Sequence, residues 1–453
     1  MRGRGRGLAF VLACVGVAVA PVPAAISTAS PPSFAAARTY ATGSGPVAVA
    51  TGDLTGDGKP DLAITNSGDD TVSVLANSGR GKLGDRRDYA TEHDAESVAL
   101  ADLDGDGDND LAVANGLSDS VSVLLNSGDG NLQPRADYTT GQGPVSVATG
   151  DLNGDTGTDL AVANLDASTV SVLLNGGHGS FTAKTDYRVG NTPTSVAVGD
   201  INADGALDIA TSNLRADTIS VLIGRGDGAF EPKRDYRTGG APISVAIGDL
   251  NGDRKLDLAA ADRGPYTDSP GWVSVLINAG DGGFATKRDY RIGGGPESVA
   301  IGDLNGDRRR DIATADPYAN NRGVDAVSVI ANRGGGSFRP KIDYRVGRSP
   351  IFVTARDLNG DRKLDLVAAN TVGDTVSVLG NLPGRCTVQR VDGMTLPSAK
   401  PRIRRANCRV GRIRHAYSQI LDEGRVIAQR PAWGAVLRGG RRVELVVSLG
   451  AKK

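Results

Sequence analysis

A short acidic motif recurs seven times along the chain. It reads DLNGDRKLD at residues 249–257, with oxygen-bearing side chains at positions 1, 3, 5 and 9. The copies begin at Asp53, Asp102, Asp151, Asp200, Asp249, Asp303 and Asp357, at steps of 49, 49, 49, 49, 54 and 54 residues. A fixed period of this length is the signature of a repeat architecture, so most of the chain should fold as seven copies of one unit.

Each repeat has the pattern of four short strands. In the third copy we expect strands A to D at 144–152, 158–165, 168–175 and 181–187, with the motif in the A–B turn. Leu160 and Val162 alternate with Ala161 and Ala163, so the side chains on one face of the sheet are large and those on the other face are small. A sheet that is apolar on both faces needs a sheet on each side, and four-stranded sheets stacked about an axis form a β-propeller.

The D strands indicate how the repeats close. There are seven of them, at residues 34–40, 83–89, 132–138, 181–187, 230–236, 284–290 and 338–344. The first precedes the first A strand, and none follows the last C strand at 374–381. We therefore expect the N-terminal strand to complete the last sheet. This gives an all-β, seven-bladed β-propeller without open edges, rather than a solenoid.

The motif has the spacing of a calcium loop, in which oxygens at alternate positions and a final carboxylate surround the ion. Three or four carboxylates within nine residues repel one another unless a cation lies between them. The alternative is an Asx-type turn, which needs no metal. The predicted calcium ligands are Asp53, Thr55, Asp57, Asp61, Asp102, Asp104, Asp106, Asp110, Asp151, Asn153, Asp155, Asp159, Asp200, Asn202, Asp204, Asp208, Asp249, Asn251, Asp253, Asp257, Asp303, Asn305, Asp307, Asp311, Asp357, Asn359, Asp361 and Asp365.

The loops differ at position 6, where a calcium loop turns sharply. Loops 1, 2 and 4 have glycine there, and we expect them to be the stronger sites. A left-handed backbone costs any other residue about 1 to 2 kcal/mol. The remaining four loops should therefore bend elsewhere or bind calcium more weakly. Their residues at position 6 are Thr156, Arg254, Arg308 and Arg362.

Residues 1–29 have the pattern of a secretory signal peptide, because the basic MRGRGRG precedes an apolar run that small residues follow. A lipoprotein signal with Cys14 lipidated is the alternative. No other apolar run approaches the ~18 residues of a spanning helix, so we expect an exported, soluble protein without a membrane span. Cys386 and Cys408 then remain as a pair in an oxidising compartment and should form a disulfide.

The repeats resemble a known family. The period, the DxNxDxxxD loops and the GSF and GxGP elements are similar to FG-GAP or VCBS-type repeats, including the blades of the integrin α-subunit head, over residues 30–383. The resemblance implies a calcium-stabilised propeller of the kind used outside the cell for adhesion or ligand binding. It does not assign a ligand, because one fold serves many functions.

Two adjacent repeats are longer, and their extra residues lie between strands B and C, at the end of the ring opposite to the motif. These loops carry Tyr266, Trp272 and Tyr318. Aromatic residues beside polar groups are typical of sugar or protein recognition, so we take these three as candidate ligand-binding residues. Ordinary loop growth, with Trp272 packed against a neighbour, is the alternative.

Few residues point to catalysis. His93, His178 and His415 are scattered over different turns and the C-terminal region, so they form no catalytic triad and no zinc motif. We therefore expect no enzymatic activity. A propeller lyase or hydrolase that uses carboxylates to act on a polysaccharide is the alternative.

Residues 384–453 form a second, basic domain. They carry 16 Lys and Arg against 4 Asp and Glu, a net +12, whereas residues 7–383 carry 32 against 48, a net −16. The pattern C(x)V…G(x)TL…A, C(x)VG, VIAQ(x)P(xx)G and V(x)LVVS(x)G resembles a PASTA domain, with Gln389 where the family usually has proline. We expect a small α+β fold with a helix at 395–407 and strands at 425–431 and 441–450. The resemblance implies contact with cell-wall peptidoglycan or related muropeptides, and the charge favours anionic polymers and surfaces.

These features predict three parts: a signal peptide at 1–29, the propeller at 30–383 and the PASTA-like domain at 384–453. We expect a secreted, monomeric calcium-binding protein that acts in binding or adhesion at the cell surface or wall. Its partner would be a cell-wall polymer, a glycan or a surface protein, and predicted export argues against nucleic acid. A purely structural module is the remaining alternative.

Overall fold

The structure is a computed structural model that describes residues 31–264, 270–317, 324–382, 386–405, 408–437 and 441–452. The predicted signal peptide lies outside the described residues. Within these residues, no helix has the length and apolar character needed to cross a membrane.

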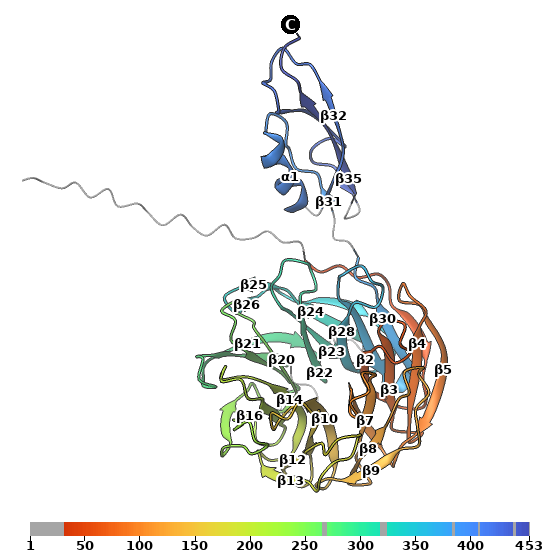
Figure 1. Ribbon diagram of the computed structural model, residues 1–453. Coiled ribbons are helices and arrows are strands. Elements are labelled where there is room, and N and C mark those ends of the chain that lie inside the picture. The colour runs from red at the N-terminus through yellow and green to blue at the C-terminus, as the bar shows by residue number, and fades with distance from the viewer. Residues whose placement is uncertain are drawn as a thin grey trace, which may run out of the picture.

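Seven four-stranded antiparallel sheets make up most of the described chain (Figure 1). The A strands are β2 (Pro46–Gly52), β6 (Ala95–Ala101), β10 (Pro144–Gly150), β14 (Pro193–Gly199), β18 (Pro242–Gly248), β22 (Ser298–Gly302) and β28 (Pro350–Arg356). The B strands are β3 (Asp61–Asn66), β7 (Asp110–Asn115), β11 (Asp159–Asn164), β15 (Asp208–Asn213), β19 (Asp257–Asp262), β23 (Asp311–Asp316) and β29 (Asp365–Asn370).

The C and D strands complete each sheet toward the outside of the ring. The C strands are β4 (Thr71–Asn77), β8 (Ser120–Leu124), β12 (Thr169–Leu173), β16 (Thr218–Leu222), β20 (Gly271–Asn278), β24 (Ala326–Ile330) and β30 (Thr375–Leu379). The D strands are β5 (Leu83–Ala90), β9 (Ala136–Thr139), β13 (Thr185–Arg188), β17 (Arg234–Arg237), β21 (Phe284–Gly293), β27 (Ile342–Arg345) and β1 (Arg38–Ala41). A small ladder of β25 (Asn332–Gly334) and β26 (Ser337–Phe338) lies between β24 and β27, and a 3-10 turn at Thr371–Gly373 joins β29 to β30.

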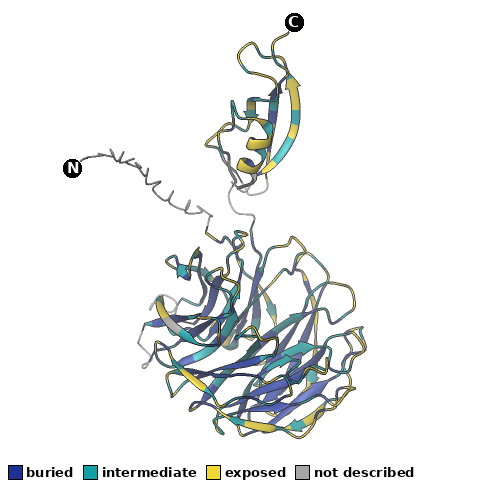
Figure 2. Cartoon of the chain, turned by 60° about the vertical axis from the view of Figure 1, so that its left-hand side comes forward, coloured by how far each residue is buried: buried dark blue, intermediate teal, exposed yellow. Residues whose placement is uncertain are grey.

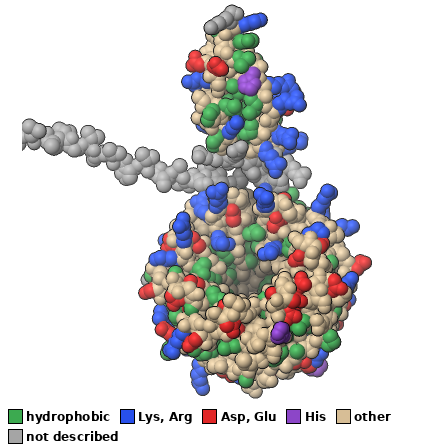
Figure 3. All heavy atoms as spheres, viewed as in Figure 1, with side chains coloured by type: hydrophobic (Ala, Val, Ile, Leu, Met, Phe, Trp, Pro, Cys, Tyr) green, Lys and Arg blue, Asp and Glu red, His purple; other side chains and the backbone are tan. Residues whose placement is uncertain are grey.

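The A strands of successive sheets contact one another in a closed cycle. β2 contacts β6, each following A strand contacts the next, and β28 returns to β2. The sheets therefore surround a central axis, and Figure 3 shows the hollow at the centre of the ring. The predicted β-propeller architecture is confirmed.

The last sheet contains strands from both ends of the propeller. β1 pairs antiparallel with β30, with Arg38 opposite Val378 and Ala41 opposite Thr375, and the sheet continues through β29 to β28. The expected closure by the N-terminal strand is therefore confirmed.

The apolar core lies between the sheets, where large side chains of one sheet pack against small ones of its neighbour. Leu160 and Val162 of β11 lie in one cluster with Ala112 and Ala114 of β7. The B strands are buried along their whole length, and most exposed residues of the propeller lie in loops and outer strands (Figure 2). The alternation seen in the sequence thus produces the packing between blades.

Five of the D strands start later than predicted, whereas β5 and β21 start at the predicted residues 83 and 284. In the third sheet the regular strand starts at Thr185 rather than at residue 181, and Phe181 instead forms an isolated bridge with Asn175. Phe181 is buried in the core between two sheets, where its ring packs edge-on against Tyr138 at 5.3 Å. The chain therefore leaves the ladder after Phe181 and rejoins it at Thr185, opposite Val172.

A tyrosine on each D strand joins its blade to the next one. The hydroxyl of Tyr187 donates to the carbonyl of Gly228 at 3.1 Å, and its ring packs edge-on against Phe230. The same hydroxyl-to-carbonyl bond is made by Tyr40, Tyr89, Tyr138, Tyr236, Tyr290 and Tyr344. These contacts link the outer strands around the whole ring.

The C-terminal domain has its own small core. β32 (Arg409–Ala416), β35 (Arg442–Ser448) and β33 (Val426–Arg430) form one sheet in that order, and β31 (Cys386–Thr387) pairs with β34 (Val436–Leu437). Helix α1 (Leu396–Arg405) contributes Ala399 and Ile403 to the core. The predicted helix and two strands are present within a few residues of their expected bounds, and the α+β fold is confirmed.

Candidate metal-binding loops

The seven A–B loops share one backbone conformation. Position 9 is in each case the first residue of strand B, and positions 4 and 6 have left-handed backbone angles in every loop. The φ angles at position 6 are 76° at Gly58, 94° at Gly107, 73° at Thr156, 93° at Gly205, 72° at Arg254, 68° at Arg308 and 65° at Arg362. The four loops without glycine at this position therefore do not bend elsewhere.

The carboxylate at position 1 holds this conformation by accepting backbone hydrogen bonds. In the second loop, the amides of Gly105 and Gly107 donate to the two oxygens of Asp102 at 2.7 and 3.0 Å. In the fifth loop, the amide of Arg254 donates to Asp249 at 2.9 Å. This bond to position 6 offsets part of the cost of a left-handed arginine.

The carboxylate at position 9 is buried and anchors the loop to the sheet. In the second loop, Asp110 accepts the amide of Leu103 at 2.8 Å and the amide of Asn126 at 2.7 Å, one on each oxygen. Burial is the main reason that the pKa of Asp110 rises to about 6. The equivalent side chains Asp61, Asp159, Asp208, Asp257, Asp311 and Asp365 accept the same pair of backbone bonds.

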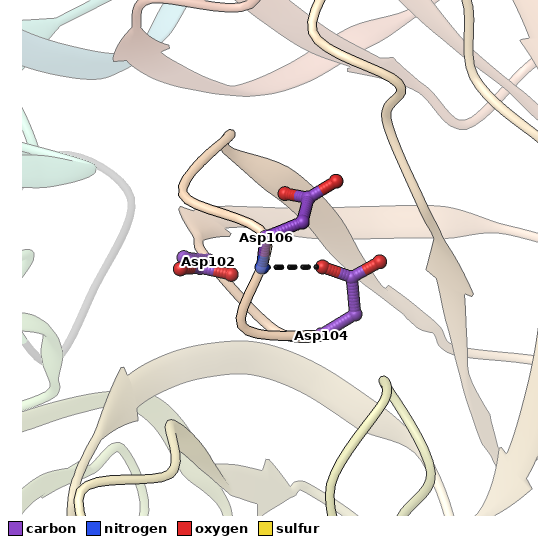
Figure 4. Close-up of side chains that lie close together, drawn as sticks. All are labelled: Asp102, Asp104 and Asp106. Atoms are coloured by element: carbon purple, nitrogen blue, oxygen red, sulfur yellow. Dashed lines mark hydrogen bonds between the residues drawn. The ribbon is translucent and has the colours of Figure 1, made fainter.

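The second loop brings three carboxylates together. Asp102, Asp104 and Asp106 each have an oxygen within 4.8 Å of the others (Figure 4). Partial burial is the main cause of the raised pKa of Asp104, and the negative charge of Asp106 raises it further. The hydrogen bond from the backbone amide of Asp106 acts in the opposite direction. The ion pairs that the described residues form include none of these three side chains. Converging oxygens without a cationic partner fit a hard divalent ion such as calcium.

The other loops arrange positions 3 and 5 differently. In loops 3 and 4 the amide nitrogens of Asn153 and Asn202 donate to the carboxylates at position 5, at 2.8 and 2.7 Å. In loop 1, Lys59 pairs with Asp57 and is the main cause of the lowered pKa of Asp57. Position 3, which holds the third carboxylate in the second loop, is the neutral Thr55, Asn153 or Asn202 in these three loops.

An asparagine near the end of strand C supports six of the seven loops and was not predicted from the sequence. The fourth blade has Gly224 at this position. In the second blade, the side-chain amide of Asn126 donates to the carbonyl of Asn109 in its own loop and to that of Leu54 in the preceding blade, both at 3.0 Å. Asn77, Asn175, Asn278, Asn332 and Asn381 make equivalent bonds. The sequence signal for this asparagine is its place two residues after the VSVL or VSVI stretch in six repeats, which is visible only when the repeats are aligned.

Comparison with protein families agrees with this geometry. Residues 53–113, 102–162, 153–211 and 303–368 match the FG-GAP-like repeat, and residues 387–449 match the PASTA domain. The chain carries FG-GAP-like repeats followed by a PASTA domain.

Solved structures with similar folds are distant in sequence. BBS1N in complex with ARL6DN has 14% identity and a TM-score of 0.54, with 77% of this chain and 96% of that chain covered. A catalytically inactive virginiamycin B lyase from Staphylococcus aureus, solved with quinupristin, has 12% identity and a TM-score of 0.53 over 77% and 99%. An Agrocybe aegerita lectin that recognises non-reducing terminal N-acetylglucosamine has 21% identity and a TM-score of 0.48 over 67% and 81%. At these identities the first two show a shared fold alone.

The predicted aromatic site at the opposite end of the FG-GAP propeller is described only in part. Trp272 lies within strand β20, opposite Asp262 and Arg291, and is half-buried. Tyr266 and Tyr318 lie outside the described residues. The described structure therefore places Trp272 in a strand and not at the tip of a loop.

The remaining predicted residues are distributed as follows. His93 pairs with Asp70 at 2.8 Å on an exposed surface, and this pairing raises the pKa of His93. In the PASTA domain, Cys408 is buried and disulfide-bonded, as the predicted pair requires, while the side chain of Cys386 lies outside the described residues.

Proposed function

We propose that the protein is a calcium-stabilised propeller that acts as a binding or adhesion protein at a cell surface or wall. The observation that carries this proposal is the convergence of Asp102, Asp104 and Asp106 in a loop whose conformation all seven blades share. These three oxygen donors, with Asp110 behind them, would hold the ion. Bound calcium would offset the repulsion among the carboxylates and fix the loop between strands A and B.

Calcium binding should raise the stability of the folded protein, because a ligand that binds only the folded state shifts the unfolding equilibrium. We expect a higher Tm in excess Ca²⁺ than in chelator, and a smaller difference for Asp104→Asn. Asp129→Asn is the matched control, since Asp129 is an exposed acid in a turn between strands C and D. Equal Tm values with and without calcium would contradict the proposal.

A position outside the cell is the second part of the proposal. It is supported by the signal-peptide pattern at 1–29 and by the PASTA domain, where Lys and Arg line the edges of the visible face (Figure 3). We expect the full chain to co-sediment with purified cell walls at low salt and to be released as salt rises, because screening weakens charge attraction. Replacement of Arg412 and Arg414 of the PASTA domain by glutamine should reduce the bound fraction. Wall binding that responds to neither change would contradict this part.

We propose binding without catalysis as the activity. The described histidines form no nucleophile–base arrangement, and the buried acids of the loops are engaged with backbone amides. Incubation of the protein with wall polymers and acidic polysaccharides should release no new reducing or unsaturated ends. Chain cleavage that is lost on mutation of one carboxylate, with the fold intact, would favour an enzyme instead.

A further inference from the structure

Positive charge is distributed unevenly over the A–B loops. Positions 6 to 8 carry a single Lys or Arg in loops 1 to 4, which is Lys59. The same positions carry seven in loops 5 to 7: Arg254, Lys255, Arg308, Arg309, Arg310, Arg362 and Lys363. Because these three loops belong to consecutive blades, the cations lie together on one sector of this end of the ring.

A pocket lies between loops 6 and 7 of this sector. Its volume is about 320 Å³, and its charged lining residues are Arg308, Arg310, Arg362, Lys363 and Asp303. Four cations thus surround one acid. The concave shape allows several of these side chains to reach the same bound group.

Three of the arginines are available to a ligand. Arg308, Arg310 and Arg362 are exposed, and their guanidinium groups make no hydrogen bond or ion pair with other described residues. Arg309 differs, since it pairs with Asp307 and donates to the carbonyl of Arg333. The guanidinium groups in the pocket therefore have no partner among the described residues. Arg309 shows that an arginine of the same loop can form an ion pair when an acid is within reach.

The one acid in the pocket does not neutralise these cations. The carboxylate of Asp303 accepts the amides of Gly306, Asp307 and Arg308 at 2.7, 3.1 and 2.8 Å. Both of its oxygens are thus held by its own loop. An incoming anion would meet the arginines without displacing an existing ion pair.

We propose that this basic pocket binds the oxyanion groups, carboxylate or phosphate, of an anionic polysaccharide or wall polymer. The planar guanidinium group matches both oxyanions with two parallel hydrogen bonds. The row of cations from Arg254 to Arg362 spans three blades, which suits a chain with repeated charges better than a single small ion. This inference rests on the proposed binding role and assigns it a surface in the propeller, separate from the PASTA domain.

The test compares two triple variants of the full chain. Arg308→Gln, Arg310→Gln and Arg362→Gln remove the pocket cations. Arg188→Gln, Arg237→Gln and Arg345→Gln remove the same charge from exposed arginines at the ends of three D strands. Binding to immobilised polygalacturonate and to poly(glycerol phosphate) is measured by biolayer interferometry in calcium at several salt concentrations, after equal melting curves confirm that both variants fold.

We expect the pocket variant to lose at least tenfold in affinity and to show a weaker salt dependence, while the control changes less than threefold. The polymer that shows the larger loss identifies carboxylate or phosphate as the natural group. Equal losses in both variants, or full binding by the pocket variant, would overturn the inference. The PASTA domain would then be the part of the chain that binds the polymer. No binding of the unmodified protein to either polymer would also overturn it, whereas the calcium-dependent Tm and wall sedimentation test the proposed function separately.

Discussion

In five blades strand B ends on asparagine, and in the two blades with long B–C loops it ends on Asp262 or Asp316. Asn164 shows the common arrangement. Its amide donates to the hydroxyl of Ser171 at 2.8 Å, and this hydroxyl donates to Asp186 at 2.6 Å. The asparagine thus supplies the proton that lets the serine bond a carboxylate on strand D.

Asp262 cannot supply that proton when it is ionised. The hydroxyl of Ser274 lies 2.5 Å from Asp262 and 2.8 Å from Asp289, but it has one proton for two carboxylates. Burial raises the pKa of Asp262 to about 7. A neutral Asp262 would restore the pattern of the asparagine blades.

Asp262→Asn should therefore stabilise the protein in a pH-dependent way. The folded pKa lies above the unfolded value of 3.8, so the stability from this group is fully present below about pH 4 and is lost as pH rises through 7. At pH 8 we expect the variant to be more stable by on the order of 2–4 kcal/mol, and near pH 4 by little. Urea denaturation at both pH values measures this difference.

The reverse change provides the control for this prediction. Asn164→Asp should destabilise the third blade at pH 8 and have less effect at low pH, because it creates the same pair of carboxylates around Ser171. A stability difference for Asp262→Asn that does not change with pH would contradict the protonation argument.

The left-handed arginines of the A–B loops give a second prediction. Arg254 has a φ of 72°, which glycine adopts without steric cost. We expect Arg254→Gly to raise the free energy of unfolding by about 1 kcal/mol in chelator. Gly107→Ala should lower it by a similar amount, since φ is 94° there. A destabilised Arg254→Gly variant would show that the arginine side chain contributes more than its backbone costs.

At this scale the sequence predicted residue types better than conformations. The ligand spacing identified all seven loops, but it left open whether the loop of Arg254 bends elsewhere or keeps the common shape and binds calcium more weakly. The bond from its amide to Asp249 holds the common shape, and such a bond depends on neighbours that a local pattern does not include. Asn126 was missed because its partners, Asn109 and Leu54, lie in two different turns.

Among the elements, the outer strands are joined by the tyrosine contacts. Tyr187→Phe should cost about 1 kcal/mol, because the carbonyl of Gly228 loses its donor while the ring can keep its packing on Phe230. Tyr417→Phe in the PASTA domain is the control, since that side chain is exposed. Urea denaturation of the two variants measures the difference, and equal stability would show that the hydroxyl bond has no net effect.

The bounds of strands A, B and C were predictable because their alternation and turns are strong local signals. Five of the seven D strands were not, and the third blade shows the reason, because Phe181 packs into the core between blades and interrupts the ladder. A continuous alternating pattern does not reveal that interruption, which depends on contacts with Tyr138 in another repeat.

For the whole molecule, ring closure depends on the N-terminal segment. Phe34 bridges to Asn381 and packs edge-on against Tyr344 at 5.0 Å, and Tyr344 donates to the carbonyl of Pro32. Phe34→Ala should cost about 3 kcal/mol from lost packing and should also speed amide exchange in β30. Phe230→Ala loses a comparable contact inside the ring.

Comparing these two variants separates the effect of ring closure from the effect of lost packing. We expect faster exchange of β30 in Phe34→Ala alone, measured by hydrogen–deuterium exchange. Equal protection of β30 in both variants would mean that closure does not depend on Phe34.

Closure itself was predictable from the sequence, because counting the D strands leaves the N-terminal strand as the one partner for the last sheet. The sector of basic loops was not recognised, because it appears only when the ring places loops 5 to 7 together.

The shared last sheet also determines when each sheet can form during translation. β1 leaves the ribosome long before its partner, since Arg38 pairs with Val378, 340 residues later (378 − 38). At roughly 5–20 residues per second, the first strand remains without that partner for about 20 to 70 seconds. Six sheets can form as the chain lengthens, but the seventh can form only after Leu379 has been added. Any translation product that stops before this residue leaves the circle incomplete.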